Sequence, residues 1–291
     1  SASMARRAGM SALSVGLTIV AFGTSFPELV VSSGASLAGR SGVSLGNAIG
    51  SNIFNIGIIL GLSALVCPLP VHHLVIRRDA PVVLAVSTTL LLMLENGRLG
   101  RLESLLLLSG LPVYAHLNIR AARRGGAGTG ERSHAAPAAG SGALADLLFV
   151  LAGLALLPLG AWFFIENTVR LARMIGISDE LIGLTFVSAG TSLPELATSV
   201  VAAIRRQPDI AIGNIMGSNV FNVLGVLGVS GVLSPLETSG DMIRDCRIMI
   251  AFTLLMIPLL YTGRKLHRAE GLALLAGYAV YMAWRLTASR L

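Results

Sequence analysis

Long apolar stretches separated by short polar gaps occupy most of the chain. A stretch of about 20 apolar residues is long enough to cross a hydrocarbon core of about 30 Å, and Pro, Gly and charged residues mark where each stretch ends. This pattern predicts nine membrane-spanning helices, at residues 10–38, 43–67, 80–96, 100–121, 144–172, 179–204, 210–235, 242–262 and 268–289. The predicted fold class is therefore an all-α polytopic membrane protein.

Composition and charge agree with this prediction. Of 291 residues, 54% are hydrophobic and only 13% are charged, about half of the ~25% that soluble proteins carry. The net charge of +7 arises from basic residues scattered through the gaps, such as Arg77 and Arg78, where we expect them to face lipid headgroups. The predicted partner is thus the lipid bilayer and not nucleic acid. The sequence leaves the oligomeric state open and is compatible with a monomer.

A polar segment rich in Gly and Ala lies between the fourth and fifth predicted spans. It predicts a flexible linker at residues 121–143 that divides the chain into a first half, residues 1–120, and a second half, residues 144–291. The membrane face that holds the amino terminus and this linker carries 13 of the 22 Lys and Arg residues. Because basic loops favour the cytoplasm, we predict that the amino terminus and the linker are cytoplasmic and that the carboxyl terminus is outside.

The two halves contain an internal repeat. Residues 16–63 align without a gap to residues 183–230, at an offset of 167 residues and with 22 of 48 positions identical. Five predicted spans separate the two starts, and because five is odd, the copies must enter the membrane from opposite sides. Such inverted pairs in transporters place the substrate site near the bilayer midplane, where the copies meet.

The same offset exposes an irregularity at the start of the chain. It aligns residues 1–12 with residues 168–179, which are the tail of the span preceding the second copy. The first copy has no complete preceding span. We therefore expect that the first helix of a five-plus-five arrangement is absent and that four plus five spans remain.

Two short motifs recur in each copy. GTSFPE at residues 23–28 precedes GNAIGSNIFN at residues 46–55, and the second copy carries GTSLPE at 190–195 and GNIMGSNVFN at 213–222. Glu28 and Glu195 lie in mid-span, where an ionisable side chain costs about 2.5–3.5 kcal/mol and usually faces a partner or a watery cavity. Pro27 and Pro194 remove an amide donor, so each helix is expected to break beside its glutamate and to free backbone carbonyls, which is tolerated where the backbone lines a cavity.

These motifs supply a set of hard oxygen ligands. Besides the two carboxylates, the set comprises the hydroxyls or amides of Thr24, Ser25, Ser51, Asn55, Thr191, Ser192, Ser218 and Asn222. Oxygen ligands without imidazole or thiolate suit Ca²⁺ or Na⁺ and do not suit zinc or copper. No cofactor is predicted. Glycines four residues apart, at Gly46 and Gly50 and at Gly213 and Gly217, are expected to let the next helix approach closely.

A buried glutamate can also be a purely structural hydrogen-bonding residue, and a single GxxxG is usually a packing device. The duplication of the whole set argues against this reading, because both copies would have to repeat the same structural detail. We therefore predict that Glu28 and Glu195 converge on one shared cation.

At these motifs the sequence resembles the calcium/cation antiporter superfamily, and most closely the prokaryotic sodium/calcium exchangers. The resemblance implies a transporter rather than an enzyme, with ten helices in two inverted five-helix halves. It also implies that Glu28 and Glu195 are shared ligands of Ca²⁺ and Na⁺, helped by the carbonyls of Thr24 and Thr191. The resemblance further implies flanking Na⁺ sites that are completed by Ser25, Ser51, Ser192, Ser218 and the carbonyls of Ala21 and Ser188. Asn55 and Asn222 would face the middle of the site.

One position departs from the family pattern. Several family members carry Asp where this chain has Asn222, so this protein contributes two formal charges to the site where they contribute three. One Ca²⁺ or two Na⁺ would neutralise two carboxylates, whereas three Na⁺ would leave a positive charge. The coupling ion and the stoichiometry therefore stay open.

The leading hypothesis is a secondary antiporter that exchanges Ca²⁺ against Na⁺ by alternating access in a bacterial inner membrane. An H⁺/Ca²⁺ antiporter of the same fold is an alternative, since buried carboxyl groups can carry protons. A non-transporting, truncated fragment is another. A channel would need a continuous polar pore in place of a central cluster, and an intramembrane hydrolase would need His or Lys near Ser25 or Ser192 in sequence.

Overall fold

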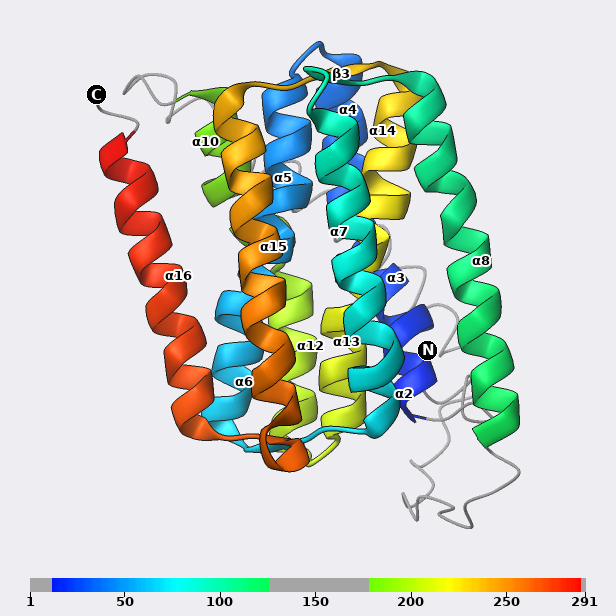
Figure 1. Cartoon of the computed structure of the whole chain (residues 1–291), viewed down its shortest axis with the longest axis vertical. Helices are drawn as coiled ribbons and strands as arrows, with labels where there is room; N and C mark the ends of the chain where they lie inside the picture. Colours follow the sequence, from blue (N-terminus) through cyan, green and yellow to red (C-terminus); the bar gives the residue numbers. More distant parts are fainter. Residues whose placement is uncertain (1–11, 126–177, 289–291) are drawn as a thin grey trace, which may run out of the picture.

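The computed structural model describes residues 12–125 and 178–288, which form an upright bundle of helices (Figure 1). The first half comprises α2 (Ala12–Val15), η1 (Gly16–Val20), α3 (Ala21–Thr24), α4 (Phe26–Leu37), α5 (Ser41–Phe54), η2 (Asn55–Leu60), α6 (Gly61–Val66), β1 (Leu69–Pro70), η3 (Val75–Asp79), α7 (Ala80–Leu94), β2 (Arg98–Leu99) and α8 (Arg101–Gly125). The second half comprises α10 (Asp179–Ile182), η4 (Gly183–Val187), α11 (Ser188–Thr191), α12 (Leu193–Ile204), α13 (Pro208–Phe221), η5 (Asn222–Leu227), α14 (Gly228–Leu233), β3 (Leu236–Glu237), α15 (Gly240–Tyr261), η6 (Thr262–Arg264), β4 (Lys265–Leu266) and α16 (Arg268–Ala288).

The internal repeat extends well beyond the two motifs. The elements from α2 to β1 recur from α10 to β3 with the same boundaries at the offset that relates Gly16 to Gly183, and α8 and α16 begin at equivalent residues. The two copies run in opposite directions, because α5 descends to α6 in Figure 1 while α13 rises to α14. The predicted inverted repeat is therefore confirmed.

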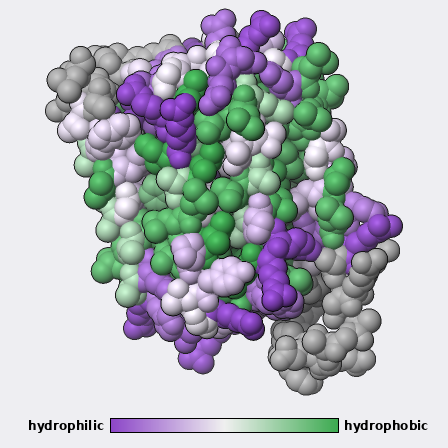
Figure 2. Space-filling view, viewed as in Figure 1, coloured by the Kyte–Doolittle hydropathy of each residue, from purple (hydrophilic) through white to green (hydrophobic). Residues whose placement is uncertain are grey.

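The predicted spans match described helices except for residues 144–172, which lie outside the described ranges together with residues 1–11 and most of the predicted linker. The α8 helix continues to Gly125, past the expected start of that linker. Four described helices are long and apolar enough to cross a membrane, and two bent pairs bring the number to six. The helical membrane fold is thus confirmed, while the count of nine spans is not. Figure 2 shows apolar side chains across the middle of one face and polar ones toward its two ends.

Both motif-bearing spans are bent where the prolines predict it. The first is bent by 43° between α3 and α4, and the second by 45° between α11 and α12. Ser25 and Ser192 occupy the two breaks with ψ values of 9° and 6°, outside the helical range. A π-helical segment, η1 or η4, precedes each break by one turn, and such segments often occur at functional sites.

Two short antiparallel ribbons, which the sequence pattern did not predict, join the halves. β1 pairs with β4, and β2 pairs with β3. At the repeat offset β1 corresponds to β3 and β2 to β4, so the ribbons are equivalent. Each strand has only two residues, which is too short for a detectable alternation of polar and apolar positions.

Glycines hold each motif helix against the opposite copy. A Cβ atom on Gly46 would lie 2.7 Å from the Glu180 carbonyl oxygen, and one on Gly50 would lie 2.5 Å from that of Leu184. Gly213 and Gly217 meet Leu13 and Leu17 at 2.9 and 2.5 Å in the same way. The predicted close approach is confirmed, but the neighbour is the first span of the other half and not the next helix along the chain, because the two repeats pack against each other at these glycines.

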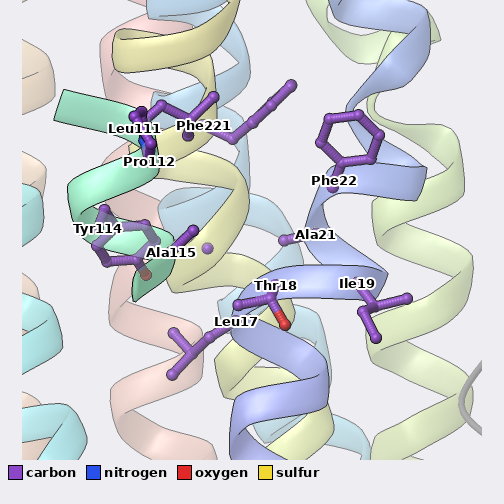
Figure 3. A pocket seen from close by; sticks show the side chains of 11 residues that line it. Leu17, Thr18, Ile19, Ala21, Phe22, Leu111, Pro112, Tyr114, Ala115 and Phe221 are labelled. Carbon is purple, nitrogen blue, oxygen red and sulfur yellow. The ribbon is translucent and has the colours of Figure 1, made fainter. Parts of the chain in front are cut away.

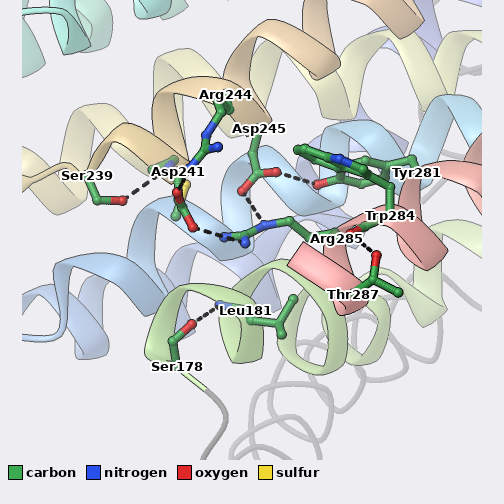
Figure 4. Close-up of polar contacts among 11 residues, drawn as sticks. Ser178, Leu181, Ser239, Asp241, Arg244, Asp245, Tyr281, Trp284, Arg285 and Thr287 are labelled. Carbon is green, nitrogen blue, oxygen red and sulfur yellow. Dashed lines mark hydrogen bonds and ion pairs between the residues drawn. The ribbon is translucent and has the colours of Figure 1, made fainter. Parts of the chain in front are cut away.

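A buried polar cluster connects α15 to α16 (Figure 4). Asp245 accepts hydrogen bonds from Tyr281 at 3.0 Å and from Arg285 at 3.2 Å, and Arg285 also reaches Asp241 at 3.1 Å. Because a buried charge is costly unless it is paired, this cluster fixes the register of the two helices.

The first half has a related cluster at equivalent positions. Arg78 donates to Asp79 at 2.8 Å and to Asn118 at 2.7 Å, which connects η3 to α8. At the repeat offset Arg78 corresponds to Asp245 and Asn118 to Arg285, so the basic residue has changed helices between the two halves. Arg78 therefore departs from the expectation that it faces lipid headgroups, since it pairs within the protein.

The glycine contacts predict that Gly50→Ala destabilises the protein. Its new Cβ would lie 2.5 Å from a backbone oxygen of a packed neighbouring helix, and overpacking of this kind costs about 1–3 kcal/mol. Thermal unfolding of the purified protein in detergent measures the effect. Gly34→Ala is the matched control, because nothing lies within 4 Å of its Cβ position; equal melting temperatures for the two variants would contradict the packing argument.

Candidate cation-binding site

Glu28 and Glu195 lie at the first turns of α4 and α12 and are both 0% exposed. Ser25 donates its hydroxyl to Glu195 Oε1 at 2.8 Å, and Ser192 donates to Glu28 Oε1 at 3.0 Å. Each carboxylate thus reaches the helix break that carries the other glutamate. The reciprocal contacts bring the two acidic side chains to the interface of the repeats.

The second oxygen of each carboxylate has no described hydrogen-bond donor. Glu28 Oε2 and Glu195 Oε2 are buried and have no hydrogen-bond partner within residues 12–125 and 178–288. Ser218 adds a longer contact of 3.4 Å to Glu195 Oε1, while the hydroxyl of its counterpart Ser51 is buried without a described partner. The site therefore combines oxygens held by hydrogen bonds with oxygens available to a ligand.

Thr24 and Thr191 are held in place by asparagines of the opposite copy. Thr191 donates to Asn47 Oδ1 at 3.0 Å, and Thr24 donates to Asn214 Oδ1 at 3.2 Å. Asn47 Nδ2 in turn donates to Ser32 at 2.9 Å. In the second copy Asn214 Nδ2 donates to Ser199 at 3.1 Å. These chains connect each helix break to the motif helix of the opposite repeat.

The backbone positions implied by the resemblance lie immediately before the breaks. The Ala21 carbonyl accepts the Ser25 amide at 3.0 Å, and the Ser188 carbonyl accepts the Ser192 amide at the same distance. The Thr24 and Thr191 hydroxyls approach these two carbonyls at 3.3 Å. Because a carbonyl oxygen has two lone pairs, a cation at either oxygen would take the place of the longer hydroxyl contact.

Asn55 and Asn222 begin the π-helical segments η2 and η5. Asn55 Nδ2 donates to Asn219 Oδ1 at 3.1 Å, and Asn222 Nδ2 donates to Asn52 Oδ1 at 3.1 Å. The oxygens Asn55 Oδ1 and Asn222 Oδ1 are buried and have no described protein partner. Both side chains are 0% exposed.

Four asparagines of this network were missed when the site was predicted from sequence: Asn47, Asn52, Asn214 and Asn219. The signal was present, because both asparagine pairs lie inside the repeated GNxxGSN motif at the repeat offset. They were missed because their role depends on contacts with the opposite copy, which the spacing within one copy does not reveal.

The site is a doubly acidic centre. No ion pair or hydrogen bond joins either glutamate to Lys, Arg or His among the described residues. That part of the chain also holds no group of three or more His, Cys, Asp or Glu side chains able to bind a metal. The arrangement fits a hard cation bound by two carboxylates and neutral oxygens.

A separate pocket of about 480 Å³ lies between the first bent span, α8 and α13. Figure 3 shows Leu17, Phe22, Tyr114 and Phe221 around it. Its lining is almost entirely apolar, and the Thr18 hydroxyl is engaged by the Ser14 carbonyl at 2.6 Å. Only Thr18 and Tyr114 bring side-chain oxygens to this lining, which is far fewer than the about six to eight oxygen ligands that Ca²⁺ takes.

Comparison with known proteins agrees with the geometry of the acidic centre. The model of the sodium/calcium exchanger protein family matches residues 1–120 and 146–287. The chain belongs to this family. It is a membrane transporter of the exchanger fold and not an enzyme.

Several relatives of this family member are similar over nearly the whole chain. A putative antiporter, CaxA, from Alkalimonas amylolytica is 36% identical, with 96% of this chain and 89% of the relative covered. The inner membrane protein YrbG of Escherichia coli is 36% identical over 96% of this chain and 88% of its own length. The sodium/calcium exchanger MaX1 of Methanosarcina acetivorans is 30% identical over 96% and 90%.

The exchanger fold is also supported by solved structures. The sodium/calcium exchanger NCX_Mj, soaked with Na⁺ and Ca²⁺, superimposes with a TM-score of 0.76 at 30% identity, covering 97% of this chain and 89% of the other. A structure of NCX_Mj soaked with Na⁺ and Sr²⁺ gives a TM-score of 0.77 over the same shares. This likeness confirms the predicted inverted-repeat transporter fold.

The asparagine network predicts that Asn214→Leu lowers the stability of the protein. The substitution removes the Asn214 amide from both hydroxyls; Thr24 keeps its backbone acceptors, but Ser199 loses its described buried partner, and an unsatisfied buried polar group costs about 1–3 kcal/mol. Thermal unfolding measures the loss. Asn96→Leu is the comparison, because it removes hydrogen bonds to Glu103 and to the Arg98 amide at an exposed turn, where water can replace them and the loss should be smaller. An equal loss of stability in the two variants would contradict the argument from burial.

Proposed function

We propose that this protein is a secondary antiporter that exports Ca²⁺ in exchange for Na⁺ by alternating access. In this proposal Glu28 and Glu195 bind the transported ions in turn, midway across the membrane. The observation that carries the proposal is the pair of buried carboxylates, each bonded to a serine of the opposite repeat and each with one oxygen free of described partners.

Charge balance supports a cation as the missing partner. Two ionised carboxylates inside a membrane protein are strongly unfavourable unless an opposite charge compensates them. The described residues supply no such charge at this site. One Ca²⁺ neutralises both carboxylates, and the hydroxyls and amides around them supply further oxygens of the kind that Ca²⁺ prefers. The ion is transported cargo and not a resident cofactor.

The same charge balance explains why the protein would exchange one ion for another and would not let either ion cross the membrane alone. An empty site would carry two negative charges through the conformational change, and charges within the bilayer are costly to move. A site loaded with one Ca²⁺ or with two Na⁺ is neutral and can reorient. Net transport of one ion then requires the return of the other, which is the property that defines an antiporter.

A proton-coupled antiporter is the second candidate. Two protons neutralise two carboxylates as completely as two Na⁺ do, and the absence of a third carboxylate at Asn222 removes the need for a third monovalent cation. The serine hydroxyls favour Na⁺ as the coupling ion, because those of Ser25, Ser192 and Ser218 contact the carboxylates and supply further hard oxygen ligands.

The membrane orientation is also part of the proposal. The basic residues favour a cytoplasmic amino terminus and linker and an external carboxyl terminus. The family and the inner membrane relative from Escherichia coli support placement in a bacterial inner membrane. Transport of Ca²⁺ toward the outside would then use the inward Na⁺ gradient.

The assignment of the two glutamates predicts that Glu28→Gln and Glu195→Gln each abolish Na⁺-driven Ca²⁺ transport. Each substitution keeps the side-chain shape but removes one of the two charges that balance Ca²⁺. Everted vesicles or proteoliposomes loaded with Na⁺ and diluted into Na⁺-free buffer with ⁴⁵Ca²⁺ measure the uptake. Glu95→Gln is the matched control, because Glu95 is half exposed at the end of α7; undiminished uptake by either site variant refutes the assignment.

The coupling ion is tested with the same proteoliposomes and two separate gradients. We expect an outward Na⁺ gradient at constant pH to drive Ca²⁺ uptake, and a pH gradient without Na⁺ to drive none above the background of the Glu28→Gln variant. The reverse result would establish proton coupling and reject Na⁺. Nigericin with equal K⁺ on both sides provides the control for the pH gradient, and monensin added together with it collapses the Na⁺ gradient without leaving a pH gradient in its place.

A further inference from the structure

We propose that Asn52 and Asn219 are positioning residues that orient the side-chain amides of Asn222 and Asn55 so that their oxygens are presented to the transported cation. This inference rests on the proposed function. It concerns two residues that do not bind the ion themselves and act through their contacts with Asn222 and Asn55.

The orientation of Asn52 is fixed by a backbone carbonyl. Asn52 Nδ2 lies 3.2 Å from the carbonyl oxygen of Asn219 and 3.5 Å from Met249 Sδ. A carbonyl oxygen can only accept a hydrogen bond. The nitrogen of the Asn52 amide must therefore face the Asn219 backbone, and its oxygen must face the other way.

The orientation of Asn52 then determines that of Asn222. Asn52 Oδ1 lies 3.1 Å from the Asn222 side chain, and it can only accept. The contacting atom of Asn222 must be its NH₂ group, since two facing oxygens would repel each other. Asn222 Oδ1 is consequently the free end of the amide, and it is buried without a described protein partner.

The pair of Asn55 and Asn219 has the equivalent arrangement with one difference. Asn55 donates to Asn219 Oδ1 at 3.1 Å and leaves its own Oδ1 buried without a described partner. Asn219 Nδ2, however, has no described acceptor, so this half has no carbonyl anchor. The side-chain oxygens of Asn55 and Asn222 are thus both available to a metal cation, the ligand expected at this site.

Buried polar atoms normally find a partner, and the two free amide oxygens have none unless a cation or water supplies it. An amide that presented its NH₂ group instead would repel the cation. Residues that orient a metal-binding side chain typically contribute about 10–100-fold to metal affinity. Because Ca²⁺ itself favours the oxygen-inward orientation, saturating Ca²⁺ restores it, and the loss should appear in apparent affinity rather than in maximal rate.

The test compares Ca²⁺ concentration dependence of Na⁺-driven uptake in proteoliposomes of the full chain. Asn52→Leu replaces the amide by a side chain with the same branching and the same number of heavy atoms, and we expect the half-saturating Ca²⁺ concentration to rise about tenfold while the maximal rate changes less than about twofold. Asn52→Ala gives the same comparison if Leu is not tolerated. Asn118→Leu is the control, because it removes an equally buried amide that contacts Arg78 outside the site.

A double-mutant cycle separates positioning from a general structural role. Asn222→Ala removes the oxygen that Asn52 is proposed to orient, so adding Asn52→Leu to Asn222→Ala should raise the half-saturating concentration no further. Additive effects, an unchanged half-saturating concentration in Asn52→Leu, or an equal rise in Asn118→Leu would each overturn the inference alone. Absence of Ca²⁺ uptake by the wild-type protein would overturn the proposed function and this inference together.

Discussion

The structure depends on one electrostatic constraint, which is that two carboxylates are buried inside a membrane protein and no basic residue in the described ranges pairs with them. Glu28 and Glu195 are fully buried, and their described contacts are hydroxyl groups. Elsewhere in the chain buried acids are paired directly, as Asp245 is with Arg285 and Asp79 with Arg78. At the helix contacts a buried acid is paired with an arginine, whereas at the ion site the described partners of the two acids are uncharged. This difference distinguishes the ion site from the structural ion pairs.

The inverted repeat makes this arrangement possible. Each helix break positions a serine that bonds to the glutamate of the opposite copy, so neither half forms the site alone. Close glycine contacts bring each motif helix against the first span of the other half. Hydrogen bonds from Thr24 to Asn214 and from Thr191 to Asn47 hold the same pairs of helices together. The two ribbons add a further connection between the halves. Because equivalent contacts recur on both sides, the site has the pseudo-symmetry expected of a binding site that opens in turn to two faces.

Much of this architecture could be predicted from sequence, because its signals are local or periodic. The constant offset revealed the repeat, the odd number of spans gave its inversion, and Pro27 and Pro194 located the helix breaks. The roles of Asn47, Asn52, Asn214 and Asn219 could not be predicted in the same way, although the motif contains them, since each role depends on a partner about 140 or more residues away in the chain. The inward pairing of Arg78 was missed because an arginine next to an apolar stretch has the same pattern whether it faces lipid or a neighbouring helix.

The most direct test of the central claim is a crystal structure of the protein soaked with Sr²⁺, whose anomalous scattering identifies the position of a divalent ion. We predict one Sr²⁺ at the interface of the two repeats, coordinated by carboxylate oxygens of both Glu28 and Glu195, and displaced when Na⁺ is present in excess. An ion bound elsewhere, or carboxylates turned away from each other, would contradict the account.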